Sequence, residues 1–135
     1  MQETRKHIDT ILIERAGRPE PDAVFVSSFG GKTGLGLSGG GDAEVWLDRE
    51  ECRAVLASMD AAAVRVETKD YEAFAEVYLE QPDDLGILVP GFVLITNHGR
   101  EIGLFISVKG GDGGQVWMTP SHSSRVMAAL RAAGP

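Results

Sequence analysis

The chain contains two strand-rich stretches in which apolar residues alternate with glycine or polar residues. Alternation with a period of two is typical of strands that bury one face. In each stretch the pattern predicts three strands joined by turns, because glycine clusters separate the apolar runs. The expected strands are 23–28, 32–38 and 44–47 in the first stretch, and 92–97, 101–109 and 115–118 in the second.

A helix is expected after each third strand. Asp48 and Glu51 have the spacing of a capping box, and Thr119 followed by Pro120 is a typical helix start. Apolar residues then recur with helical spacing, which predicts one buried face on each helix. The expected core positions are Cys52, Val55, Leu56 and Met59 in the first helix, and Val126, Met127, Leu130 and Ala133 in the second.

The segments that precede the two stretches, at about 7–16 and 71–81, mix helical and strand periodicity. The spacing of Ile8, Ile11 and Leu12 favours a helix in the first of them. Tyr71, Phe74 and Tyr78 have a similar spacing in the second segment. We therefore predict helices there, with strands as the alternative, and a short linking strand at 64–68.

The two halves also resemble each other in sequence. Residues 45–59 align with 116–130 at an offset of 71, which makes Trp46 and Trp117 equivalent, and 25–38 align with 94–107 at an offset of 69. A three-stranded meander with one helix buries little apolar surface by itself. We therefore predict a single α+β domain built as a pseudo-twofold tandem repeat. Its units, about 4–60 and 70–133, are each a three-stranded antiparallel meander and a helix, preceded by a helix or strand.

Composition limits the classes of partner. The 135 residues carry a net charge of −7, with 13 basic and 20 acidic side chains. This balance disfavours nucleic-acid binding, which draws on Lys and Arg, and suits a basic protein partner. The absence of a long apolar run and of a signal-like N-terminus predicts a cytoplasmic protein that does not enter membranes. Cys52 is the only cysteine, so neither a disulfide framework nor a thiolate zinc site is expected.

The sequence carries no motif that identifies a reaction. The stretch 30–34, GGKTG, lacks the earlier glycine and the following helix of a phosphate-binding loop, so it predicts a hairpin turn. The histidines His7, His98 and His122 do not have the spacing of a helical zinc pair. We expect no metal or cofactor. An enzyme with a site near His98 and His122 remains one alternative.

Strand parity suggests a second alternative. If the leucines of the middle strands face the helices, then Trp46, Trp117 and Phe105 face away from them, with Arg100 and Lys109 nearby. Aromatic sheet faces stack the bases of single strands. In element order alone, the two meander–helix units resemble the Pur-alpha and whirly single-strand binders, a resemblance that implies a nucleic-acid site on the sheet. Alternatively, the tryptophans are buried within the fold or in a homodimer.

The interpretation we favour is a non-catalytic, small acidic protein-interaction module of the adaptor or inhibitor type. It acts through its acidic surface or its exposed sheet face, and its partner is another protein, basic in character, or a second copy of the chain. The candidate binding face comprises Trp46, Trp117, Phe105, Arg100 and Lys109.

Overall fold

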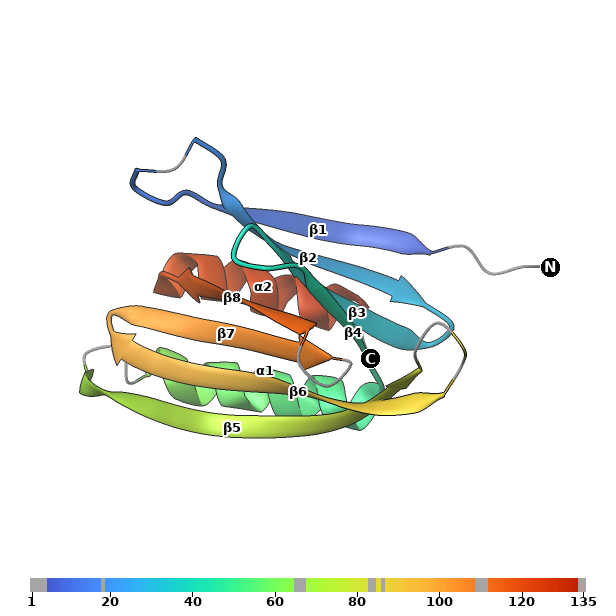
Figure 1. The fold of residues 1–135 in the computed structure, drawn as a ribbon. Coiled ribbons are helices and arrows are strands. Elements are labelled where there is room, and N and C mark those ends of the chain that lie inside the picture. Colours follow the sequence, from blue (N-terminus) through green and yellow to red (C-terminus); the bar gives the residue numbers. More distant parts are fainter. Residues whose placement is uncertain are drawn as a thin grey trace.

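The computed structural model describes residues 5–17, 19–64, 68–82, 85, 87–108 and 112–133. These residues form an α+β fold with two antiparallel four-stranded sheets, each followed in the chain by one helix (Figure 1). The first sheet has the order β1(Lys6–Ile13), β2(Asp22–Phe29), β3(Lys32–Ser38) and β4(Ala43–Leu47), and α1(Arg49–Ala63) follows it. The second has the order β5(Thr68–Pro82), β6(Leu88–Gly99), β7(Glu101–Val108) and β8(Asp112–Met118), and α2(Pro120–Ala133) follows it.

The three expected strands and the helix of each half are confirmed, with ends that differ from the predicted ones by a few residues at most. The capping box of α1 is present, since the Glu51 N–H donates to the Asp48 carboxylate and the Asp48 N–H donates to the Glu51 carboxylate, both at 2.8 Å. At the start of α2, the His122 N–H donates to the Thr119 hydroxyl at 3.2 Å. The capping signals in the sequence therefore predicted both helix starts correctly.

The predicted helices before each meander were wrong, because both segments are strands. β1 pairs with β2, and β5 pairs with β6. In β1, Ile11 and Ile13 are buried while Leu12 between them is 55% exposed, which is the alternation of a strand. Pairing with a neighbouring strand outweighs the helical spacing of Ile8, Ile11 and Leu12. Of the expected linking strand, residues 65–67 lie outside the described part of the chain.

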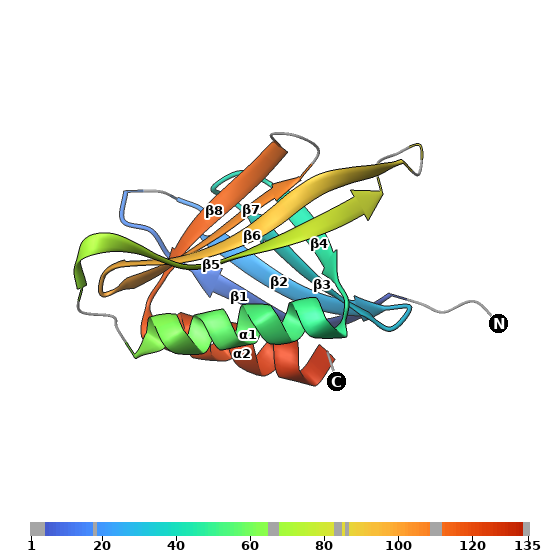
Figure 2. The ribbon, with the colours of Figure 1, turned by 90° about the horizontal axis from the view of Figure 1, so that it is seen from below.

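Each helix packs mainly on the sheet of the other half. Helix α1 contacts β5 and β6, and α2 contacts β1 and β2, while the two helices also contact each other. Seen from below, they lie side by side beneath the two sheets (Figure 2). The sheets approach each other through β4 and β7 and through β3 and β8. The buried apolar residues of both halves consequently form a single core cluster.

Glycines allow the two sheets to approach closely. The Gln115 N–H donates to the Gly40 carbonyl at 2.9 Å, joining the loop between β3 and β4 to β8. A Cβ atom on Gly40 would lie 2.2 Å from the Gln115 carbonyl oxygen, and one on Gly114 would lie 2.6 Å from the Gly41 oxygen. The glycine-rich stretches therefore contribute contact between the halves as well as turns.

Among the described residues, neither helix has the length and apolar character needed to span a bilayer.

Candidate functional site

Both tryptophans lie on the sheet faces that point away from the helices. Trp46 on β4 pairs with Gly34 on β3, and Trp117 on β8 pairs with Gly103 on β7. Their sequence neighbours on β4 and β8 point into the core. These are Val45, Leu47, Val116 and Met118, all 0% exposed. The predicted strand parity is confirmed, and the tryptophans themselves are half-buried.

Each indole lies close over the glycine of the adjacent strand. A Cβ on Gly34 would be 2.9 Å from the Trp46 ring, and a Cβ on Gly103 would be 2.9 Å from the Trp117 ring. The same two Cβ positions lie 2.8 Å from the Ser27 hydroxyl and 2.4 Å from the Thr96 hydroxyl. Glycine thus leaves room for the rings to pack closely against the adjacent strand, which accounts for their half-buried state.

On the first sheet, Arg5 lies over Trp46. The guanidinium carbon is 5.2 Å from the centre of the indole, within the range of a cation–π contact. The same guanidinium binds the Glu44 carboxylate through two hydrogen bonds, Nη1–Oε1 at 3.3 Å and Nη2–Oε2 at 2.5 Å. Phe29 meets the indole edge-on, with ring centres 6.4 Å apart. A charged pair and two aromatic rings therefore share this part of the face.

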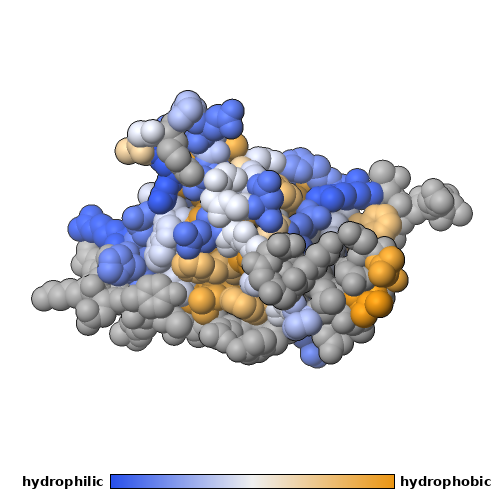
Figure 3. All heavy atoms as spheres, viewed as in Figure 1, coloured by the Kyte–Doolittle hydropathy of each residue, from blue (hydrophilic) through white to orange (hydrophobic). Residues whose placement is uncertain are grey.

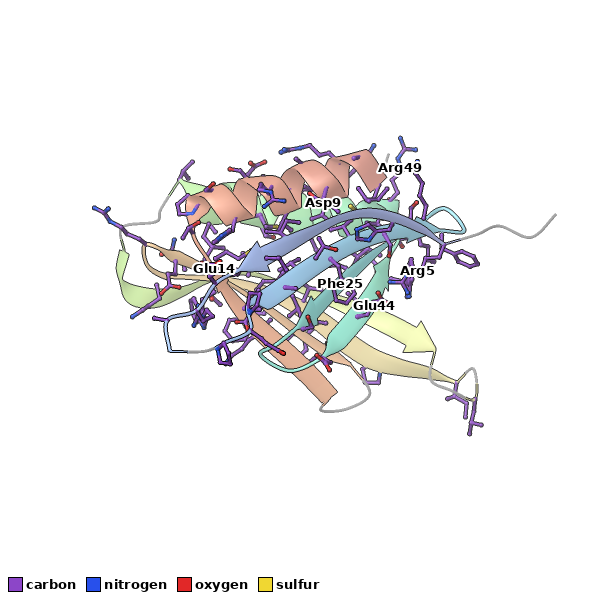
Figure 4. All side chains as sticks on the ribbon, turned by 90° about the horizontal axis from the view of Figure 1, so that it is seen from above. Arg5, Asp9, Glu14, Phe25, Glu44 and Arg49 are labelled. Carbon is purple, nitrogen blue, oxygen red and sulfur yellow. The ribbon has the colours of Figure 1, made fainter. Side chains whose placement is uncertain are left out.

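A shallow groove of about 590 Å³ adjoins this cluster. Its floor is apolar and its rim is charged. The lining residues are Arg5, Phe25, Leu37, Ser38, Asp42, Ala43 and Glu44. Figure 4 shows Arg5, Phe25 and Glu44 near one another on the first sheet, with Glu14 at the far end of β1. No family model, curated protein or solved structure matches this chain. The geometry of these residues is therefore the basis for assigning a function.

The second sheet carries a related aromatic cluster, and its described side chains include no counterpart of the Arg5–Glu44 pair. His98 meets Trp117 edge-on at 6.5 Å, much as Phe29 meets Trp46, and Phe105 meets it at 5.6 Å. Arg100 is exposed next to His98, whereas Lys109 lies outside the described residues. Figure 3 shows apolar atoms over β6 and β7 bordered by polar ones. The structure thus brings Trp117 and Phe105 together, while Trp46 belongs to a different sheet.

The groups considered for catalysis have structural partners. His122 accepts from the Thr119 hydroxyl or donates to it at 3.1 Å and forms part of the start of α2, whereas His98 contacts Trp117. Cys52 is 2% exposed. Burial raises the pKa of its thiol, and a hydrogen bond with Thr33 lowers that pKa by a smaller amount. A thiol in this environment stays protonated and is a poor nucleophile.

A polar pocket of about 350 Å³ lies where the two sheets meet. Arg15 crosses it: its Nη1 donates to the Trp117 carbonyl at 3.3 Å and lies 3.5 Å from the Glu101 carboxylate, and its Nε lies 3.9 Å from the buried Asp22 carboxylate. Arg15 and Asp22 come from the first half, and Trp117 and Glu101 from the second. The contacts of Arg15 therefore connect residues of the two halves.

Four residues of this cluster and groove are not among the site residues expected from the sequence: Arg5, Glu44, Phe25 and Phe29. Arg5 and Glu44 are 39 residues apart in the chain, so no local pattern indicates their contact. Arg5 also immediately precedes a segment that we predicted as a helix. One signal was available, since strand parity places Glu44 on the same face as Trp46.

Proposed function

We propose that this protein is a non-catalytic binding module that recognises another protein through the outer face of its first sheet. The observation that carries the proposal is the composition of that face. Phe29, which is 45% exposed, lies edge-on beside half-buried Trp46, and the Arg5–Glu44 pair lies next to the same ring. Leu12 on β1, which is 55% exposed, adds apolar surface at the other edge of this sheet. Tryptophan contributes a large share of the binding energy of many protein interfaces, and aromatic residues are enriched in them. A groove beside such residues offers a place for a side chain of the partner.

The structural roles of His122 and Cys52 support a non-catalytic function. His122 is held by Thr119 at a helix start, and Cys52 is buried as a thiol. The described residues contain no group of three or more His, Cys, Asp or Glu side chains positioned to hold a metal ion. An enzyme acting through His98 and His122 has correspondingly little support.

Single-strand nucleic-acid binding is the weaker alternative. The Trp46 ring has Gly34 on one side and the Arg5 guanidinium above it, so a base that stacks there would displace Arg5 and leave the Glu44 carboxylate without its cation. The net charge of −7 also repels phosphates. Trp117 and Phe105 offer aromatic surface on the second sheet, but Arg100 is the only neighbouring cation among the described candidates.

The tandem repeat also belongs to this proposal. We infer that the halves are pseudo-twofold related units, each comprising four strands and a helix. Three parallels support it: the Gly34–Trp46 and Gly103–Trp117 pairs, the edge-on ring beside each tryptophan, and a capping side chain three residues before its partner at the start of each helix. Under the 71-residue offset, Gln115 stands where the first half has Glu44. The charged pair of the binding face therefore distinguishes the first unit from the second.

Site-specific photo-crosslinking tests the proposed function. Benzoylphenylalanine is placed at position 29 or 12 on the sheet face, and at the exposed position 53 on α1 as a control. We expect irradiation in a lysate of the source cells to attach one protein from positions 29 and 12 but not from 53. The attached protein, once purified, should bind the wild-type chain and lose at least tenfold in affinity to Phe29→Asp. Crosslinks only from position 53, or only to nucleic acid, contradict the proposal.

A further inference from the structure

The Arg5 side chain occupies a small site that has the chemistry of an arginine receptor. The Trp46 ring supplies a face for the planar guanidinium, and the Glu44 carboxylate accepts two of its hydrogen bonds. A planar cation with forked donors matches both groups, which an ammonium group does less well. Trp46 and Glu44 both belong to β4, so the strand holds them in place whether or not Arg5 is there.

We infer that this site binds an arginine side chain of a partner protein, and that Arg5 is an intramolecular competitor that the partner displaces. The inference rests on the proposed function and specifies the partner: a basic segment with an exposed arginine. Charge supports this choice of occupant. Asp42 on the groove rim is an exposed carboxylate beside Glu44, and the whole chain carries −7. A partner that brings its own arginine would complement this charge.

Arg5 is suited to be displaced rather than to hold the fold together. Its side chain is 50% exposed and that of Glu44 is 25% exposed. Ion pairs and cation–π contacts that are this exposed contribute little free energy. Because Arg5 is bound weakly, its competition reduces the affinity of a partner by roughly tenfold. The adjacent groove, with Phe25 and Leu37 in its lining, offers room for the aliphatic part of an incoming arginine or for the residue next to it.

The second sheet provides an internal control. Trp117 also lies over a glycine, but its equivalent of Glu44 is the uncharged Gln115. The ring next to it belongs to His98, whereas Trp46 has Phe29. An arginine that binds through nonspecific attraction to an acidic protein would affect both tryptophans, whereas binding at the proposed site affects Trp46 alone.

The test is a titration followed by NMR, in which the indole N–H signals of Trp46 and Trp117 are assigned with W46F and W117F. The probe is a blocked pentapeptide with a central arginine flanked by glycines. The same peptide with citrulline has the shape without the charge, and one with lysine has the charge without the planar fork. The expected result is a saturable shift of the Trp46 signal with the arginine peptide, a weaker one with lysine and none with citrulline. The Trp117 signal should stay in place.

Two variants with matched controls make the test specific. Arg5→Ala should lower the peptide concentration for half-saturation about tenfold, while Lys6→Ala, which removes the same charge from the adjacent exposed residue, should leave it within twofold. Glu44→Gln should abolish the Trp46 shift, while Glu14→Gln at the far end of β1 should not. These exposed substitutions leave the core cluster unchanged, and the rest of the NMR spectrum reports whether each variant is folded.

Four outcomes overturn the inference. Equal shifts of Trp46 and Trp117, equal binding of the arginine and citrulline peptides, or no gain of affinity in Arg5→Ala would each exclude an arginine site controlled by Arg5. A single-stranded oligonucleotide that shifts Trp46 at lower concentration than the peptide would also overturn it. If any of these occurs while a protein still crosslinks from position 29, the arginine inference fails and the proposed function stands. Loss of that crosslink is the separate failure of the proposed function.

Discussion

The contact between the glycine loop of the first half and strand β8 of the second can be tested by adding one methyl group. Gly40→Ala places a Cβ 2.2 Å from the Gln115 carbonyl oxygen, about 1 Å closer than carbon and oxygen tolerate without strain. The main chain fixes the position of the Cβ, and its partner is a main-chain oxygen, so no side-chain rotation relieves the clash. The loop must move away from β8, which also removes the hydrogen bond from the Gln115 N–H to the Gly40 carbonyl.

The expected cost follows from these two effects. Overpacking a rigid site costs about 1–3 kcal/mol, and the lost hydrogen bond adds about 0.5–1.5 kcal/mol. We therefore expect Gly40→Ala to lower the free energy of unfolding by about 2–4 kcal/mol. A chain of this length has a total of roughly 7–20 kcal/mol, so the variant still folds. Its Tm should fall by about 8–16 °C, at roughly 4 °C per kcal/mol.

Gly30→Ala is the matched control, because backbone conformation alone predicts that Gly30→Ala is destabilised more than Gly40→Ala. Gly30 has φ +60°, where alanine is strained, but a Cβ there would have no atom within 4 Å. An alanine in the left-handed backbone region lowers the free energy of unfolding by about 1–2 kcal/mol. The smaller conformational freedom of the unfolded chain offsets about 0.4–1 kcal/mol of this loss. Urea unfolding followed by circular dichroism measures both variants. If Gly30→Ala is destabilised as much as Gly40→Ala, the loop does not pack on β8 as described.

Three further substitutions test other parts of the structure. Asp48→Ala should lower the free energy of unfolding by about 1 kcal/mol in urea titrations, because it removes the capping box of α1; no loss would contradict the cap. Thr96→Val should leave stability unchanged or raise it by about 1 kcal/mol, because the buried Thr96 hydroxyl has no hydrogen-bond partner among the described residues; a loss above 1 kcal/mol would reveal a partner. Cys52 should react with a thiol reagent only on unfolding. Its raised pKa means that the protonated thiol stabilises the fold fully below the unfolded pKa, about 8.5, and that this contribution is lost as the pH rises further. The urea midpoint of the wild type should therefore fall more steeply between pH 8 and 10 than that of Cys52→Ala, and equal slopes would refute this.

Local patterns predicted the elements whose signals are local. Leu35 and Leu37 on β3 alternate with glycines, so one face of the strand was evident and the outward direction of Trp46 followed from it. The capping residues of α1 lie three positions apart and were equally evident. Such features depend on neighbours within a few residues, which the sequence displays directly.

Features that depend on distant pairing could not be predicted in the same way. β1 has apolar residues at positions that fit a helix or a strand, and only the pairing of Ile11 with Val24 on β2 decides between them. Residues far apart in the chain also meet where each helix packs on the sheet of the other half, and where Arg5 contacts Trp46. With one sequence, nothing local distinguishes these arrangements from their alternatives.

The proposed repeat helps to separate residues needed for folding from residues available for binding. Positions that match between the halves have a packing explanation: Gly34 and Gly103 make room for Trp46 and Trp117 in the same way. Outward-facing positions that differ between the halves have no such packing explanation, since the fold accommodates either residue there. Glu44, whose equivalent in the second half is Gln115, is such a difference. It lies beside Trp46, the only tryptophan that the described residues place under an arginine. Selection for stability does not require a carboxylate at that point, so we expect Glu44→Gln to leave the Tm within 2 °C and to change binding instead. A larger fall in Tm would show that the Arg5–Glu44 pair serves the fold.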